Sequence, residues 1–139
     1  MPMKTPFGLF PLALTLLVGG CASTTPAPTS KAYTPAKGSA ERAAIVTGVK
    51  QALAKQGRTN VVLEIPYLKV NGGWAWIQVT PSSADGSQHY ESQSGLLKEE
   101  AKKWTLREWM PAEEGTDENA YFKNLKSKYP QAPADIFPK

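Results

Sequence analysis

The sequence predicts an α+β fold, in which an N-terminal helix packs on a four-stranded antiparallel sheet and a short helix follows. Three observations support this class: helical spacing of apolar residues over 40–56, an Asn71-Gly72 pair between two strand-like segments, and a second pair of strand-like segments over 95–110. One helix followed by paired strands is typical of small α+β domains, with the sheet curved around the helix.

The first element is a helix with one buried face. Ser39 can cap its N-terminus, Glu41 suits the positive end of the helix dipole, and Gly57 ends the pattern. Gly48 lowers the helix propensity of the segment. The apolar positions at three-and-four spacing, which we expect to be buried, are Ile45, Val46, Val49, Ala52 and Leu53.

The segment NVVLEIPYLKVNGGWAWIQVTP predicts a β-hairpin. Asn-Gly is favoured where a two-residue turn needs positive φ twice, so we expect Val70 to face Gly73. A bulge near Pro66 would bring the apolar residues upstream onto the same side as those downstream. One side of the hairpin then carries Leu68, Val70, Ala75, Ile77 and Val79, and the other carries Tyr67, Lys69, Trp74, Trp76 and Gln78.

A second hairpin is expected over 95–110, with its turn near Ala101-Lys102. This register places Leu97 opposite Leu106 and assigns Trp104 to the main core. The residues left on the other side are Leu96, Arg107 and Trp109.

The last element is a short helix that Thr116 and Asp117 can cap, with Tyr121, Phe122 and Leu125 along one side. A turn-rich loop joins the two hairpins, and a proline-rich tail ends the sequence. The order of elements resembles that of cystatin-like and NTF2-like small domains.

Residues 1–20 follow the plan of a secretory signal peptide, with Lys4 before an apolar run over 7–18. A helix that spans a bilayer needs about 20 apolar residues, so this run is too short to be a permanent span. Val18-Gly19-Gly20-Cys21 resembles the lipobox of bacterial lipoproteins. The alternative is ordinary cleavage after Ala22, which would discard the single cysteine.

The lipobox resemblance implies that Cys21 receives diacylglycerol and fatty acyl chains and becomes the first mature residue. In that family an aspartate after the cysteine favours retention at the inner membrane. Ala22 therefore implies the periplasmic face of the outer membrane, if the cell has two membranes. Loss of Lys4 with the leader lowers the formal net charge from +4 to +3, a mild excess that suits an ordinary soluble surface.

Residues 21–38 comprise the cysteine and a linker rich in Thr, Ser, Ala and Pro. A largely polyproline-like chain rises about 3.1 Å per residue, so the linker could hold the next domain up to about 50 Å from a membrane. Residues 39–139 have a common length for one domain. Their motifs LKVNGGWAWIQV, KKWTLREW and KYPQAPADIF resemble those of small exported proteobacterial proteins to which no activity is attached.

The residues give little support for catalysis. The single histidine, His89, shares a loop with Asp85, Ser92 and Ser94, but we expect Asp85-Gly86 to form a turn with polar neighbours. The sequence has no set of metal ligands at matched spacing and no nucleotide-binding glycine motif. We therefore expect a protein that is not an enzyme, with no cofactor and no nucleic-acid partner.

The remaining signal is an aromatic sheet face bordered by cations, which could stack on sugars or form the centre of a protein interface. We expect a lipid-anchored envelope protein that binds an envelope protein or a wall polymer such as peptidoglycan through this face. One alternative is that the C-terminal segment covers the tryptophans. Another is a small-ligand or enzymatic pocket within an NTF2-like curved sheet. The candidate face comprises Tyr67, Lys69, Trp74, Trp76, Arg107 and Trp109.

Overall fold

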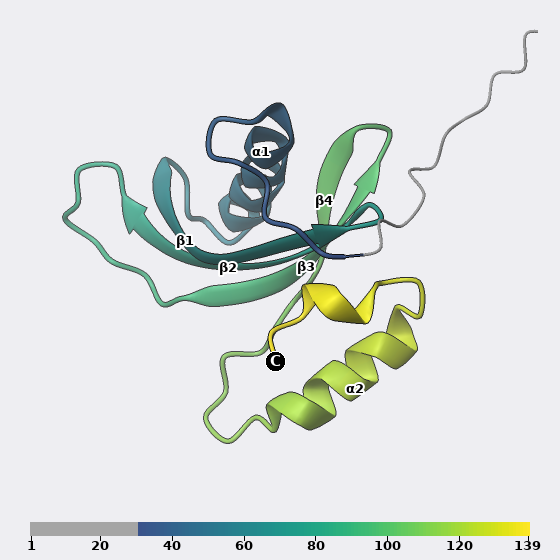
Figure 1. The fold of residues 1–139 in the computed structure, drawn as a ribbon. Coiled ribbons are helices and arrows are strands. Elements are labelled where there is room, and N and C mark those ends of the chain that lie inside the picture. Colours follow the sequence, from purple (N-terminus) through teal and green to yellow (C-terminus); the bar gives the residue numbers. More distant parts are fainter. Residues whose placement is uncertain (1–30) are drawn as a thin grey trace, which may run out of the picture.

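A computed structural model describes residues 31–139 as an antiparallel sheet between two helical layers (Figure 1). The strands are β1 (Val61–Asn71), β2 (Trp74–Ser83), β3 (Gln93–Glu100) and β4 (Lys103–Trp109), and they lie side by side in that order. The helix α1 (Ala40–Lys55) covers one side of the sheet. The helix α2 (Glu118–Lys128) and the 3-10 helix η1 (Ala134–Ile136) cover the other. The predicted α+β class is confirmed.

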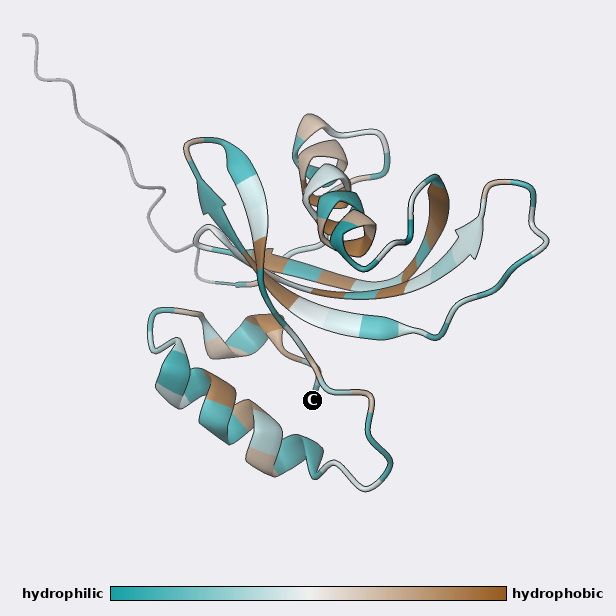
Figure 2. Ribbon diagram, turned by 180° about the vertical axis from the view of Figure 1, so that it is seen from behind, coloured by the Kyte–Doolittle hydropathy of each residue, from teal (hydrophilic) through white to brown (hydrophobic). Residues whose placement is uncertain are grey.

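The first helix forms as its capping pattern predicts, because the Ser39 hydroxyl accepts a hydrogen bond of 3.2 Å from the Arg42 amide. Its apolar stripe faces the sheet, as the hydropathy colouring shows (Figure 2). Gly48 lies where α1 approaches β4 most closely: an added Cβ would be 2.3 Å from the Trp104 carbonyl oxygen. The main core is formed by Ile45, Val49, Leu53, Val61, Leu68, Val70, Ala75, Ile77, Val79, Leu97 and Trp104.

The first hairpin turns one residue later than predicted. Asn71 pairs with Trp74 and Val70 pairs with Ala75, so the turn residues are Gly72 and Gly73, both with positive φ. The predicted pairing of Val70 with Gly73 is therefore wrong. The physical reason is that Asn71 continues the strand and uses its side chain in a tertiary hydrogen bond. The predicted sides of the hairpin are unaffected, because this change preserves which residues share a face.

The predicted bulge is confirmed, since the register of β1 and β2 shifts between Glu64 and Tyr67. Upstream of the shift, Val61 is buried in the main core, and Leu63 and Ile65 pack against it.

The second hairpin turns at Ala101 and Lys102, both with positive φ, and Leu97 pairs with Leu106 as predicted. A further register shift, between Leu96 and Leu97, was not predicted. It places Trp109 opposite Gly95 and against the main core.

The other side of the sheet carries a second, aromatic core. Asp117 caps α2 by accepting hydrogen bonds from the Asn119 and Ala120 amides, so the predicted final helix is confirmed. Beyond α2, the chain returns over the sheet through η1. The buried members of this second core are Trp74, Trp76, Leu96, Leu125, Ala132, Ile136 and Phe137.

Residues 31–38, predicted to be part of a flexible linker, pack on the domain. Tyr33 exchanges two backbone hydrogen bonds with Val70, of 3.0 and 2.8 Å, and Pro35 is buried. The Thr34 hydroxyl donates to the Leu68 carbonyl at 2.8 Å. This part of the predicted linker therefore contacts the domain, and the predicted signal peptide (1–20), Cys21 and the rest of the linker lie outside the described residues.

Candidate ligand-binding cleft

The structure does not leave the predicted aromatic face open. Trp76 is only 1% exposed, and its ring contacts Phe122 and Phe137 with centroid distances of 5.2 and 5.4 Å. Trp74 is 7% exposed. The sequence leaves two arrangements open, a bare tryptophan surface and a covered second core, and the structure has the second, because α2 and the C-terminal segment bury both tryptophans.

Of three other members of the predicted face, Tyr67 and Lys69 line one hollow, and Trp109 lies elsewhere. Tyr67 donates a 2.9 Å hydrogen bond to the Ile136 carbonyl, and burial raises its pKa, with a smaller contribution from the charge of Asp135. Tyr67 and Lys69 both line a separate hollow beside residues 34–37. Trp109 lies on the opposite side of the sheet, because the register shift in β3 and β4 turns it toward α1. Tyr67 and Lys69 therefore lie together, whereas Trp109 does not share a face with them.

Trp74 and Arg107 are the two predicted residues that do meet at an open cleft. It has a volume of about 330 Å³ and lies between the β3–β4 hairpin and the end of α2. Strand alternation places Lys98 and Glu100 on the same side as Leu96, and the end of α2 supplies the opposite wall. The lining residues are Trp74, Lys98, Glu100, Arg107, Lys128, Tyr129, Pro130 and Gln131.

The cleft is rich in cations arranged around one carboxylate. Arg107 donates a hydrogen bond to Glu100, and the Lys98 Nζ lies 3.8 Å from the same Glu100 oxygen. The side chain of Glu100 is 57% exposed, so solvent screens these pairs and the carboxylate can be displaced by another anion. Across the cleft, Lys128 donates a 2.9 Å hydrogen bond to Glu108, which raises the Lys128 pKa.

Aromatic rings border the same cations. The Lys98 Nζ lies 5.1 Å from the centre of the Trp74 ring, and the Lys128 Nζ lies 5.6 Å from the centre of the Tyr129 ring. The two rings meet edge to face at 5.8 Å. Such an arrangement holds the ammonium groups in place by cation–π attraction and offers N–H donors, with the partly exposed Tyr129 ring beside them, to a ligand. It is suited to a carboxylate attached to a sugar or a short peptide.

The groups considered for catalysis are not assembled. His89 and Glu64 are exposed, and Asp85 uses its carboxylate within a local turn. Hydrogen bonds from the Ser83 and Ser87 hydroxyls lower the Asp85 pKa to about 2. Within residues 31–139, no three His, Cys, Asp or Glu side chains gather as a group able to hold a metal ion. In that same part of the chain, no helix has the length and apolar content needed to cross a bilayer.

Sequence reasoning missed the other residues of the cleft, and four of them carry its chemistry: Lys98, Glu100, Lys128 and Tyr129. The first two could have been found, since strand alternation from Leu96 puts them on the same side. Lys128 and Tyr129 could not, because only the tertiary packing of α2 brings them to the hairpin.

Comparison of the chain with protein-family models, curated proteins and solved structures finds no match in any of the three.

Proposed function

We propose that this chain is a non-enzymatic, lipid-anchored protein of the bacterial envelope that binds a carboxylate-bearing wall polymer. The observation that carries the proposal is the cleft itself, where Lys98, Arg107 and Lys128 surround a space bordered by two aromatic rings. A sugar ring can lie against the partly exposed Tyr129 ring while its carboxylate accepts charge-assisted hydrogen bonds from Lys98 and Arg107. The exposed Glu100 would be displaced from Arg107 by the incoming carboxylate.

The proposed location comes from the leader rather than from the cleft. The Val18–Cys21 segment supports export and acylation, which would place the domain at the periplasmic face of the outer membrane. Several acyl chains on one residue are enough for stable attachment. Replacement of Cys21 by Ala tests this part of the proposal: the acylated mass should disappear, and the protein should move from the membrane fraction to the soluble one. An unchanged mature mass would refute the anchor.

The wall-polymer proposal is tested by co-sedimentation of the protein with isolated peptidoglycan. Lys98→Gln combined with Arg107→Gln should weaken binding at least tenfold, because each charge-assisted hydrogen bond contributes about 1.5–3 kcal/mol. The matched control, Lys50→Gln combined with Lys55→Gln, removes the same charge from exposed positions on α1 and should bind as wild type does. Equal losses of binding in both variants would mean that only net charge matters. No loss of binding in either variant would exclude the cleft as the binding site. Binding to acidic envelope proteins but not to peptidoglycan would replace the polymer by a protein partner.

The alternative of a small-ligand or enzymatic pocket inside the curved sheet has less support. α1 occupies that side of the sheet, and Ile45, Val49 and Leu53 are each 0% exposed there. A hollow at this layer lies at its edge, between the end of α1 and Trp109.

A further inference from the structure

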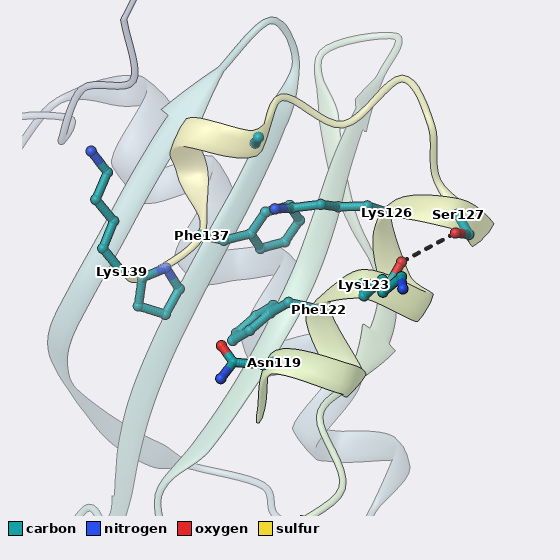
Figure 3. Close-up of a pocket in the computed structure, with 9 residues that line it drawn as sticks. Asn119, Phe122, Lys123, Lys126, Ser127, Phe137 and Lys139 are labelled. Carbon is teal, nitrogen blue, oxygen red and sulfur yellow. Dashed lines mark hydrogen bonds between the residues drawn. The ribbon is translucent and has the colours of Figure 1, made fainter. Parts of the chain in front are cut away.

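A second hollow, unrelated to the cleft, lies between α2 and the C-terminal segment and has a volume of about 630 Å³ (Figure 3). We call it the lysine groove and define it by Phe122, Lys123, Lys126, Phe137 and Lys139. The α2 residues face the groove because they recur at the three-and-four spacing of one helix face. The tail residues supply the opposite wall.

The charge of the lysine groove is of one sign. Three of its lining residues are lysines and none is acidic. Among residues 31–139, neither Lys123 nor Lys139 forms an ion pair, whereas Lys128 on the other edge of α2 is paired with Glu108. Asp135, next to the lining residue Ala134, is not itself a lining residue, and its carboxylate accepts hydrogen bonds from the Ala32 amide and the Asn71 side chain.

The floor of the lysine groove is apolar and rigid. The Phe122 and Phe137 rings lie 5.4 Å apart, and both pack against the buried Trp76. The Lys126 Nζ lies 5.8 Å from the centre of the Phe137 ring, so its aliphatic stem extends over the floor toward the tail (Figure 3). Ammonium groups above aromatic rings are suited to a ligand with an anionic head and an apolar body.

The place where the described chain begins indicates which ligand of this kind would lie near the lysine groove. The described chain begins beside η1, where the Ala32 amide donates a 2.7 Å hydrogen bond to Asp135, and Ala134 of η1 also lines the groove. Because residues 31–38 pack on the domain, residues 21–30 alone would connect Cys21 to it, and they span at most about 35 Å. This step depends on the proposed acylation of Cys21. An acylated chain would therefore hold the groove close to a phospholipid surface.

We propose that the lysine groove binds the phosphate headgroups of anionic phospholipids in the membrane to which the chain is attached. The lysines would contact the phosphates, and the Phe122 and Phe137 rings would contact the glycerol and upper acyl region. Such a contact would fix the orientation of the domain, so that the cleft at the other end of α2 is presented in a constant direction.

Vesicle co-sedimentation tests this inference with the full chain carrying Cys21→Ala, so that acylation contributes nothing. Vesicles of phosphatidylcholine alone are compared with vesicles that also contain phosphatidylglycerol. Each lysine near an anionic surface strengthens binding roughly fivefold, so Lys123→Gln combined with Lys126→Gln should reduce binding to the anionic vesicles roughly tenfold or more. The control pair on α1, Lys50→Gln with Lys55→Gln, should reduce it far less. All variants share the same N-terminus, so lipid binding by residues 1–20 cancels in the comparison.

The outcomes separate this inference from the proposed anchor and from the cleft. Loss of anionic binding in the groove variant, with the Lys98→Gln and Arg107→Gln variant unaffected, would support the inference even if Cys21 proves unmodified. Equal binding by the groove variant and the α1 control would overturn it. Inorganic phosphate that displaces the protein at the same concentration as the lipid phosphate would also overturn it, because the groove would then be a site for the free anion.

Discussion

The two sides of the sheet are covered by different means. On one side, α1 packs on the strands through aliphatic side chains such as Ile45, Val49 and Leu53. On the other, α2 and η1 pack through aromatic rings, and side-chain hydrogen bonds from Tyr67 and Asn71 fasten η1. The second layer leaves hollows at both edges of α2, and these are the cleft and the lysine groove. In this molecule the aromatic layer carries the candidate binding sites.

The largest effect is expected from removing the centre of the aromatic layer. Trp76→Ala should lower the free energy of unfolding by about 3–5 kcal/mol, because it deletes a fully buried indole that contacts Phe122 and Phe137. Urea denaturation followed by circular dichroism measures the change. The control Trp76→Phe retains a ring and should lose clearly less. A loss below about 1 kcal/mol in Trp76→Ala would mean that the C-terminal layer does not pack on the sheet as described.

On the α1 side, the sensitive feature is the closeness of helix and strand. Gly48→Ala should lower the free energy of unfolding by about 1–3 kcal/mol, because the new Cβ would lie 2.3 Å from the Trp104 carbonyl oxygen. This net loss already includes the gain of about 1 kcal/mol that alanine provides over glycine in a helix. Thr47→Ala, at the neighbouring exposed position, is the control and should change stability little. A Gly48→Ala protein more stable than wild type would show that α1 can move away from β4 at no cost.

The hydrogen bonds that fasten the second layer are expected to have a smaller and more local effect. Asn71→Ala removes the donor to Asp135, at 3.1 Å, from a residue only 3% exposed, and should cost about 1–3 kcal/mol. Hydrogen exchange should accelerate in α2 and η1 but not in α1. Asn124→Ala, at an exposed position on α2, is the control and should leave exchange unchanged. Equal acceleration in both helices would mean that the two layers unfold together.

Local patterns predicted the elements of this fold well, since helix caps, strand alternation and turn residues act over a few positions. The turn of the first hairpin was misplaced because Asn71, a typical turn residue, instead makes a tertiary contact with Asp135. Trp109 was assigned to the wrong side because one register shift at Leu96 reverses the direction of the end of β4. In the first case the decisive partner is distant in the sequence. In the second case the decisive feature is a bulge that no turn residue marks.

The candidate site was less predictable than the fold. The sequence identified the aromatic side of the sheet and its cationic border, but it could not establish what covers the tryptophans. That outcome depends on the return of residues 118–137 across the sheet, which buries Trp76 and leaves only the surroundings of Trp74 and Arg107 open. The segment 31–38 also reads as linker by composition, and its pairing with β1 depends on the free edge of the sheet.

The smallest effect is expected at residues 31–38, as a dependence of stability on pH. Burial, together with the hydrogen bond from its phenol to Glu41, raises the pKa of Tyr33 from 10.0 to about 12. The folded state therefore favours the protonated phenol, so this contribution to stability is complete below pH 10.0 and is lost as the pH rises toward 12. Tyr33→Phe should be slightly less stable near neutral pH and should lose less stability than wild type over that alkaline range, measured as urea midpoints. Burial also raises the pKa of Tyr121 to about 12, but Tyr121 belongs to the aromatic layer. Tyr121→Phe should therefore alter the alkaline loss of stability. It should leave the rate of protease cleavage within residues 31–38 unchanged. If Tyr33→Phe kept the full alkaline loss of the wild type, the phenol of Tyr33 would not be what couples this segment to the domain.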